Sequence, residues 1–223
     1  SRLLSTRSAS SRRGASAGPV SATGRQPGPP PGGGPARPPS PTRQHGRNHT
    51  FYTKYAFRKE YASAESYFKN HNFANLDYIY GTLSNHDGEN PVDYAAFEAN
   101  PTGFTVVACN AEDGSTKYFD KSRARFDDFD VIKASSAVPV ACEPYVVAGV
   151  PYFDGGIADP VPVQKALDDG YDKVILILSR LRNEVRKQQK DLAPARILER
   201  SYPAAAEKLR MRYKTYNDEN QRP

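Results

Sequence analysis

Alternating apolar and polar residues predict a β-hairpin near the middle of the chain. In "GFTVVACNAEDGSTKYFD", residues 104–110 form the first strand, residues 112–114 the turn, and residues 117–119 the start of the returning strand. The following "FDDFDVIKASSAVPV" predicts a short helix over residues 126–137, because a helix is disfavoured at the residue that precedes Pro139. The middle of the chain therefore combines paired strands with a helix.

The next apolar runs predict the order strand, helix, strand. "EPYVVAGVPYFDGG" contains two strands, with a turn at Ala148–Gly149, and the second strand ends at Asp154. A helix begins near residues 160–162, where proline is tolerated in the first turn, and ends at Gly170. The continuous apolar run in "DKVILILS" is typical of a strand buried on both faces of a parallel sheet. We therefore expect a βαβ unit, in which the strand ending at Asp154 pairs in parallel with residues 173–179.

The two ends of the chain differ in their apolar content. Residues 193–221 are predicted to be helical, with an interruption at Pro203. Residues 1–45 are rich in Ser, Arg, Gly and Pro and contain little that can be buried, so we expect this segment to be disordered. Aromatic and aliphatic residues return near Gly46, and residues 46–223 are predicted to form the folded domain.

Charge follows the same division. The first 48 residues carry eight arginines and no acidic residue, which leaves 23 basic against 25 acidic residues in the rest of the chain. The net charge of +6 therefore describes the N-terminal segment alone. These cations lack the interleaved aromatic residues that stack on bases, so the composition does not indicate a nucleic-acid partner.

Cysteine content and hydropathy indicate the compartment. Cys109 and Cys142 are the only cysteines and form no CxxC pair, so neither a disulfide framework nor a zinc site is predicted. No apolar run approaches the roughly 20 residues that span a bilayer. We expect a soluble protein in the reduced cytoplasm.

An acid followed by two glycines stands where a predicted strand must turn. Asp154 in "YFDGG" has two interpretations: a turn residue, since Asp-Gly is frequent in turns, or a catalytic base. Asp159 is predicted to cap the helix that begins at Pro160. Ser135 and Ser136 are expected to pack as small residues under the site.

Several strings together resemble the C-terminal half of a bacterial patatin-like phospholipase. They are "KASSAVPV", "YFDGGIADPVPVQKALDDGYDKVILIL" and, for the middle section of that family, "QHGRN", "FANLDYIY" and "DYAAFEANPTGFTVVA". The resemblance covers roughly residues 44–217. It implies a patatin-like three-layer α/β/α domain, N-terminally incomplete because the first strand, the oxyanion loop and the elbow strand are unrecognisable.

The resemblance also implies the chemistry. The family hydrolyses lipid or phospholipid acyl esters through a Ser-Asp dyad, without a metal or another cofactor, and its members make transient contact with a membrane surface. Asp154 matches the base of the dyad, and Gly155 and Gly156 complete the motif. Two glycines allow the chain to leave the strand steeply, without a Cβ in the cleft.

The serine of the dyad has one candidate. "GASAG" at residues 14–18 places Ser16 in the G-x-S-x-G pattern, but no apolar strand precedes it and no packed helix follows it. The triple glycine Gly32-Gly33-Gly34 comes after Ser16, whereas the oxyanion loop of the family precedes the serine. Two functions therefore stay open: a serine acyl-ester hydrolase, and a catalytically inactive fragment or acyl-chain-binding pseudoenzyme.

Overall fold

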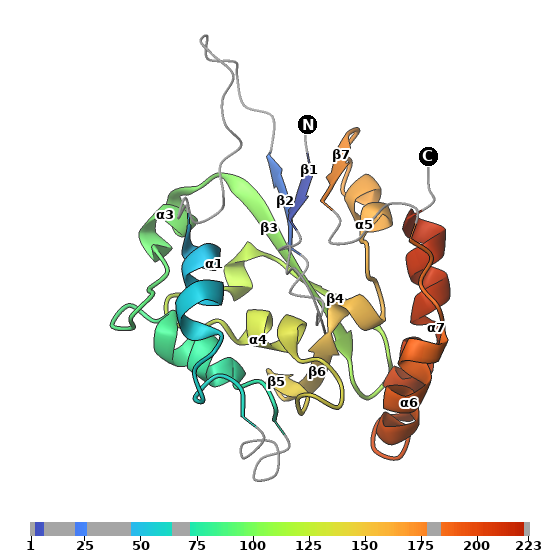
Figure 1. The fold of residues 1–223 in the computed structure, drawn as a ribbon. Coiled ribbons are helices and arrows are strands. Elements are labelled where there is room, and N and C mark those ends of the chain that lie inside the picture. Colours follow the sequence, from blue (N-terminus) through green and yellow to red (C-terminus); the bar gives the residue numbers. More distant parts are fainter. Residues whose placement is uncertain (1–2, 7–20, 26–45, 64–71, 178–183, 221–223) are drawn as a thin grey trace.

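A computed structural model describes residues 3–6, 21–25, 46–63, 72–177 and 184–220 (Figure 1). The strands are β1 (Leu3–Thr6), β2 (Ser21–Arg25), β3 (Thr102–Asn110), β4 (Thr116–Phe119), β5 (Tyr145–Val147), β6 (Val150–Asp154) and β7 (Val174–Leu176). The α-helices are α1 (Arg47–Thr50), α3 (Tyr94–Ala99), α4 (Asp130–Ser136), α5 (Val163–Asp168), α6 (Gln189–Leu198) and α7 (Pro203–Asn220). Shorter turns are the π-helical η1 (Phe51–Tyr55) and η2 (Tyr78–Leu83) and the 3-10 helices η3 (Lys121–Arg123) and η4 (Gly155–Ile157).

The described strands form one sheet in the order β5-β6-β3-β2-β1-β7, with β4 also paired to β3. Neighbouring strands are antiparallel except for β1 and β7, which are parallel. The predicted hairpin is confirmed, since β3 and β4 pair with Val106 opposite Phe119. The predicted turn between β5 and β6 is also confirmed, and its two residues, Ala148 and Gly149, both have a positive φ, as a tight two-residue hairpin requires.

The sheet lies between two helical layers. Val106 and Ala108 of β3 are buried in one apolar cluster, together with side chains from α3 and α4. Cys109, on the opposite face of the same strand, is buried in a second cluster with side chains from α6 and α7. Figure 1 shows α4 on one side of the sheet and α6 and α7 on the other. The expected three-layer α/β fold is therefore confirmed.

The expected parallel pairing of the strand ending at Asp154 with the strand from Lys173 is wrong. β6 pairs antiparallel with β3 and β5, whereas β7 pairs with β1. Nor is β7 buried on both faces, because Ile175 and Leu176 are 45% and 37% exposed. An apolar run indicates a strand but not its neighbours, and here β3, β2 and β1 stand between β6 and β7. Residues 178 and 179 of the expected strand lie outside the described residues.

Two strands lie within the segment whose composition predicts disorder. β1 and β2 pair antiparallel, and β2 continues the sheet along β3, with Ser21 opposite Val106. Strand pairing uses backbone hydrogen bonds, so a segment that is poor in apolar side chains can still join an available sheet edge. The other residues of 1–45 lie outside the described residues, and their disorder stays a prediction.

The helix α4 begins at Asp130, four residues later than the sequence predicts. Phe126 and its neighbours instead form a tight turn, in which the backbone of Arg125 pairs with that of Asp128. Asp127 in this turn has a φ of 53°, and its carboxylate accepts a hydrogen bond of 2.8 Å from the backbone N–H of His86. The longer helix is therefore replaced by a turn whose own Asp127 carboxylate binds the backbone of the distant His86.

At the C-terminal end, the expected interruption at Pro203 is confirmed. α6 ends at Leu198 and α7 begins at Pro203, which occupies a first-turn position where its missing N–H is tolerated. Among the helices of the described segments, none combines the length and the apolar character that crossing a bilayer requires.

The end of β6 approaches β3 more closely than any side chain permits. A Cβ placed on Gly155 would lie 2.8 Å from the Cβ of Val107 and would overlap the Val107 carbonyl group. Glycine at this position is therefore a packing requirement, and the contact sets where the chain leaves the sheet.

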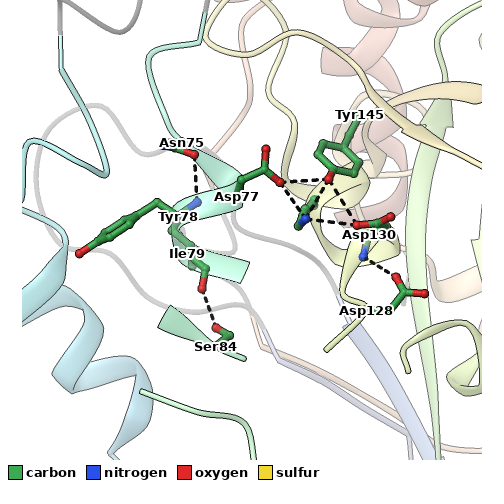
Figure 2. A network of polar contacts seen from close by, with 9 residues as sticks. Asn75, Asp77, Tyr78, Ile79, Ser84, Asp128, Asp130 and Tyr145 are labelled. Atoms are coloured by element: carbon green, nitrogen blue, oxygen red, sulfur yellow. Dashed lines mark hydrogen bonds and ion pairs between the residues drawn. The ribbon is translucent and has the colours of Figure 1, made fainter. Parts of the chain in front are cut away.

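A polar cluster attaches α4 to two other elements. The Nζ atom of Lys133 lies 2.7 Å from Asp77 Oδ1, 2.8 Å from the Tyr145 hydroxyl and 3.2 Å from Asp130 Oδ1 (Figure 2). Desolvation of Lys133 opposes its charge, but the hydrogen bonds to Asp77 and Tyr145 outweigh it and raise the pKa of the lysine. The ammonium group therefore stays charged although only 11% of its side chain is exposed.

Replacing Gly155 with alanine is expected to destabilise the fold by about 3 kcal/mol, the upper end of typical overpacking penalties, because backbone atoms of β3 block the added methyl group. Urea denaturation followed by circular dichroism measures the loss. The control is Gly81→Ala, whose Cβ would meet only the Lys133 Nζ atom at 3.9 Å. This control should change the stability by less than about 1 kcal/mol. Equal midpoints for the two variants would contradict the close approach.

Replacing Lys133 with methionine is expected to cost about 1–3 kcal/mol at neutral pH, because the variant loses charged hydrogen bonds to Asp77 and Tyr145. Desolvation raises the pKa of Asp77, but its contacts with Lys133 outweigh this effect and lower it overall. The stabilisation is therefore complete above the unfolded pKa of Asp, about 4, and decreases as the pH falls through the folded pKa. Urea midpoints of the two proteins should converge in acid.

The matched control for this variant is Lys165→Met, which removes an i,i+4 pair with Asp169 on the surface of α5. Such a pair contributes about 0.5 kcal/mol or less. If Lys133→Met and Lys165→Met lose equal stability at neutral pH, the cluster does not hold α4 in place.

Candidate active site

Asp154 is a buried carboxylate whose position two hydrogen bonds define. It is the last residue of β6 and is only 3% exposed. Its backbone N–H donates to the Ala137 carbonyl oxygen, just beyond α4, at 2.8 Å. Its side-chain Oδ1 accepts a hydrogen bond of 2.7 Å from the N–H of Gly156. The acid is thus fixed both to the helix on one side and to the turn that follows.

The two glycines after Asp154 form the turn that ends the strand. The Gly155 carbonyl oxygen accepts hydrogen bonds from the N–H groups of Ala158 at 3.1 Å and of Asp159 at 2.9 Å, so the chain coils immediately into η4. Gly155 permits the close approach to β3, and Gly156 supplies the N–H that binds the carboxylate. The two glycines thus hold the Asp154 carboxylate in a fixed position at the end of the strand.

A serine next to Ala137, the residue that binds the Asp154 backbone, contacts a tyrosine from another element. The hydroxyl of Tyr80 in η2 is 3.2 Å from Ser136 Oγ in α4, and Ser136 in turn donates to the Ile132 carbonyl oxygen at 2.8 Å. Desolvation is the main cause that raises the pKa of Tyr80, and the charge of Asp154 raises it further. Tyr80 is therefore a neutral hydroxyl that can donate a hydrogen bond.

Arg47 supplies a positive charge to the same region. Its guanidinium donates to Ser84 Oγ at 2.6 Å and to the Asn90 carbonyl oxygen at 2.7 Å. Burial lowers the pKa of Arg47, and its charge in turn acts to lower the pKa of Tyr80. Ser84 Oγ also donates to the Ile79 carbonyl oxygen, as Figure 2 shows, so the same residues link α1 to η2.

The expected role of Asp159 as a helix cap is wrong. α5 begins at Val163 without any side-chain cap, and Asp159 instead accepts a hydrogen bond from the Tyr118 hydroxyl. The physical reason is that the backbone N–H groups that a cap at Asp159 would bind are missing or already bonded. Pro162 has no N–H, and the N–H of Val161 donates to Glu219 Oε2 of α7 at 3.1 Å, so neither can bind an Asp159 cap.

The two serines of α4 differ in their surroundings. Ser135 is 1% exposed, and its hydroxyl has no hydrogen-bond partner among the described residues. It is thus a small buried residue, as expected. Ser136 goes beyond packing, because its hydroxyl binds Tyr80. Pattern reasoning gave no role to Tyr80 or Arg47, although both lie in strings that resemble the family, because their hydrogen-bond partners are distant in the sequence.

The residues predicted for the other half of the dyad cannot be placed. Ser16 and the triple glycine at residues 32–34 lie outside the described residues. Within the part of the chain that the structure describes, no three His, Cys, Asp or Glu side chains gather closely enough to hold a metal ion. The described site therefore consists of one fixed carboxylate, joined through Ala137 to the pair of Ser136 and Tyr80.

Comparison with known proteins found a relative and a matching family model. The uncharacterized protein YjjU of Escherichia coli (strain K12) is 28% identical over 126 residues, which cover 56% of this chain and 34% of that protein. The chain thus spans about a third of the length of this curated relative. A family model described as patatin-like phospholipase matches residues 33–167. Because this match covers more than half of the chain, the chain belongs to the patatin-like phospholipase family.

Proposed function

We propose that this protein hydrolyses acyl esters of lipids or phospholipids through a Ser-Asp dyad, with Asp154 as the general base. The observation that carries the proposal is the buried carboxylate of Asp154, held by the N–H of Gly156 at the end of a strand in a member of this family. A lipid substrate implies transient contact with a membrane surface. The two free, buried cysteines are compatible with a reduced cytoplasmic setting, which is part of the proposal.

In this mechanism the serine hydroxyl attacks the carbonyl carbon of the ester, and Asp154 accepts its proton. The tetrahedral intermediate then collapses, the alcohol leaves with that proton, and an acyl-serine ester remains. Water attacks the acyl-serine, and Asp154 accepts a proton from the water. As the second tetrahedral intermediate collapses, this proton passes to the serine oxygen, and the free serine hydroxyl, the Asp154 carboxylate and the fatty acid result. Ser16 is the candidate nucleophile, because it is the one serine in a G-x-S-x-G pattern.

The alternative is a protein that binds acyl chains without hydrolysing them. The observation that favours it is the sequence around Ser16, where "STRSASSRR" precedes and "PVSATGRQPGPPP" follows, so neither flank resembles an elbow strand or helix. The two functions differ in one respect: only the hydrolase forms a covalent bond with an acyl group or with an active-site probe.

Asp154→Asn is expected to lower hydrolysis of a p-nitrophenyl acyl ester by about 10² to 10⁴-fold, the contribution of a general base. Asparagine retains an Oδ1 atom that can accept from Gly156, so the melting temperature should change little. The matched control is Asp168→Asn on the exposed face of α5, which should keep full activity. A folded Asp154→Asn protein with unchanged hydrolysis would remove the base assignment.

A fluorophosphonate probe tests the nucleophile separately. The unaltered chain should be labelled, and Ser16→Ala should abolish the labelling because the probe reacts only with an activated serine. Labelling that persists in Ser16→Ala would assign another serine. A folded chain with neither labelling nor hydrolysis would contradict the hydrolase and favour the acyl-binding alternative.

A further inference from the structure

The segment after α1 exposes an unusual aromatic surface. Phe57 is 86% exposed, more than any other large apolar side chain of the described residues, and Tyr52 in η1 is 40% exposed. Phe73 is 50% exposed. It belongs to a neighbouring segment, which the backbone bond from the Asn75 N–H to the Tyr61 carbonyl oxygen joins to the end of this one at 2.7 Å. Exposed phenylalanine is unfavourable in water, so such a surface indicates a partner.

The exposure of Phe57 does not come from a loose segment. Tyr55, two residues earlier, is 1% exposed, and its hydroxyl donates to the Glu89 carbonyl oxygen at 3.2 Å. Arg58, the next residue, forms two hydrogen bonds with the Glu89 carboxylate, at 2.6 and 2.9 Å. Residues on both sides of Phe57 are therefore anchored to the body of the domain, and the phenyl ring projects outward from a fixed backbone.

Cationic residues flank Phe57 in the sequence. The Lys54 side chain is 57% exposed, and Lys59 is exposed as well. Arg58 is neutralised by Glu89, whereas Lys54 lies 3.7 Å from the same carboxylate, so its pairing is looser. Counting Glu60 as well, the surface of Lys54, Arg58, Lys59, Glu60 and Glu89 carries a surplus of one positive charge. Long lysine side chains can reach lipid phosphates while an adjacent aromatic ring enters the interface.

Printed contacts join the aromatic surface to the candidate active site through η2. Arg58 donates to the Tyr78 hydroxyl of η2 at 3.0 Å, and Tyr80 of the same element lies 3.2 Å from Ser136 Oγ in α4. Ala137, the residue after Ser136, accepts the N–H of Asp154 at 2.8 Å. A surface connected in this way to the carboxylate suits a protein whose proposed substrate is a lipid ester.

From these contacts we infer that residues 52–59, with Phe57 at the tip and Lys54 and Lys59 beside it, dock the protein on a phospholipid bilayer that contains anionic lipid. The inference rests on the proposed function for its choice of a lipid partner. Phe57 enters the interface, and the lysines bind headgroup phosphates.

Sedimentation with vesicles of phosphatidylcholine, with and without phosphatidylglycerol, tests this inference without any turnover. Phe57→Ser should weaken binding to both kinds of vesicle about tenfold, because burial of the ring is lost. Lys59→Glu should weaken binding to the anionic vesicles about tenfold or more and leave binding to pure phosphatidylcholine unchanged. The matched control is Ile197→Ser on α6, also an exposed apolar residue at 64%, which should bind as the unaltered chain does.

The other possible results of this experiment each decide between the docking surface and its alternatives. If the unaltered chain binds no vesicles, or if Phe57→Ser binds as well as Ile197→Ser does, the docking surface is wrong. A dimer in vesicle-free solution that Phe57→Ser dissociates would assign this face to a second copy of the chain instead. If vesicle binding depends on Phe57 but the protein has no esterase activity, the docking surface is supported and only the proposed hydrolase function is wrong.

Discussion

The architecture around Asp154 depends on the close approach of Gly155 to the backbone of β3. Because no Cβ separates them, β6 can end directly against the central strand, with Asp154 opposite Ala108. The Ala137 carbonyl oxygen then binds the Asp154 N–H, and Gly156 binds its carboxylate. A single contact between two backbones thus determines where the strand stops, where the helix beside it ends, and where the acid lies.

Around this fixed acid, the remaining groups come from segments that are distant in the sequence. Tyr80 is held by Ser136, and the Lys133 cluster joins the elements that carry these two residues, because Asp77 directly precedes η2 and Lys133 lies in α4. The charged cluster spans the boundary of the domain, because Lys133 is largely buried whereas its partner Asp77 is 69% exposed. The backbone that holds the acid is thus tied to neighbouring elements from the interior to the surface.

Much of this could be predicted from local sequence, because the features concerned depend on local backbone chemistry. The turn at Ala148–Gly149 and the acid motif at Asp154 need residues that accept unusual backbone geometry, and such residues are recognisable in a short window. The position of β7 and the role of Asp159 could not be predicted. An apolar run has the same pattern at the edge of a sheet as inside it, and Asp159 binds Tyr118 only because the fold brings β4 beside it.

The measurement that tests this account most directly is amide hydrogen exchange, read from peptides that cover β3, the turn after β6, and β7. If the contact between Gly155 and β3 organises the domain, residues 104–110 and 150–157 should exchange last, at the free energy of global unfolding. Residues 174–177, at the exposed end of the sheet, should exchange much earlier. Exchange of residues 150–157 as fast as that of β7 would contradict the central claim, because Asp154 would then belong to a locally unfolding segment.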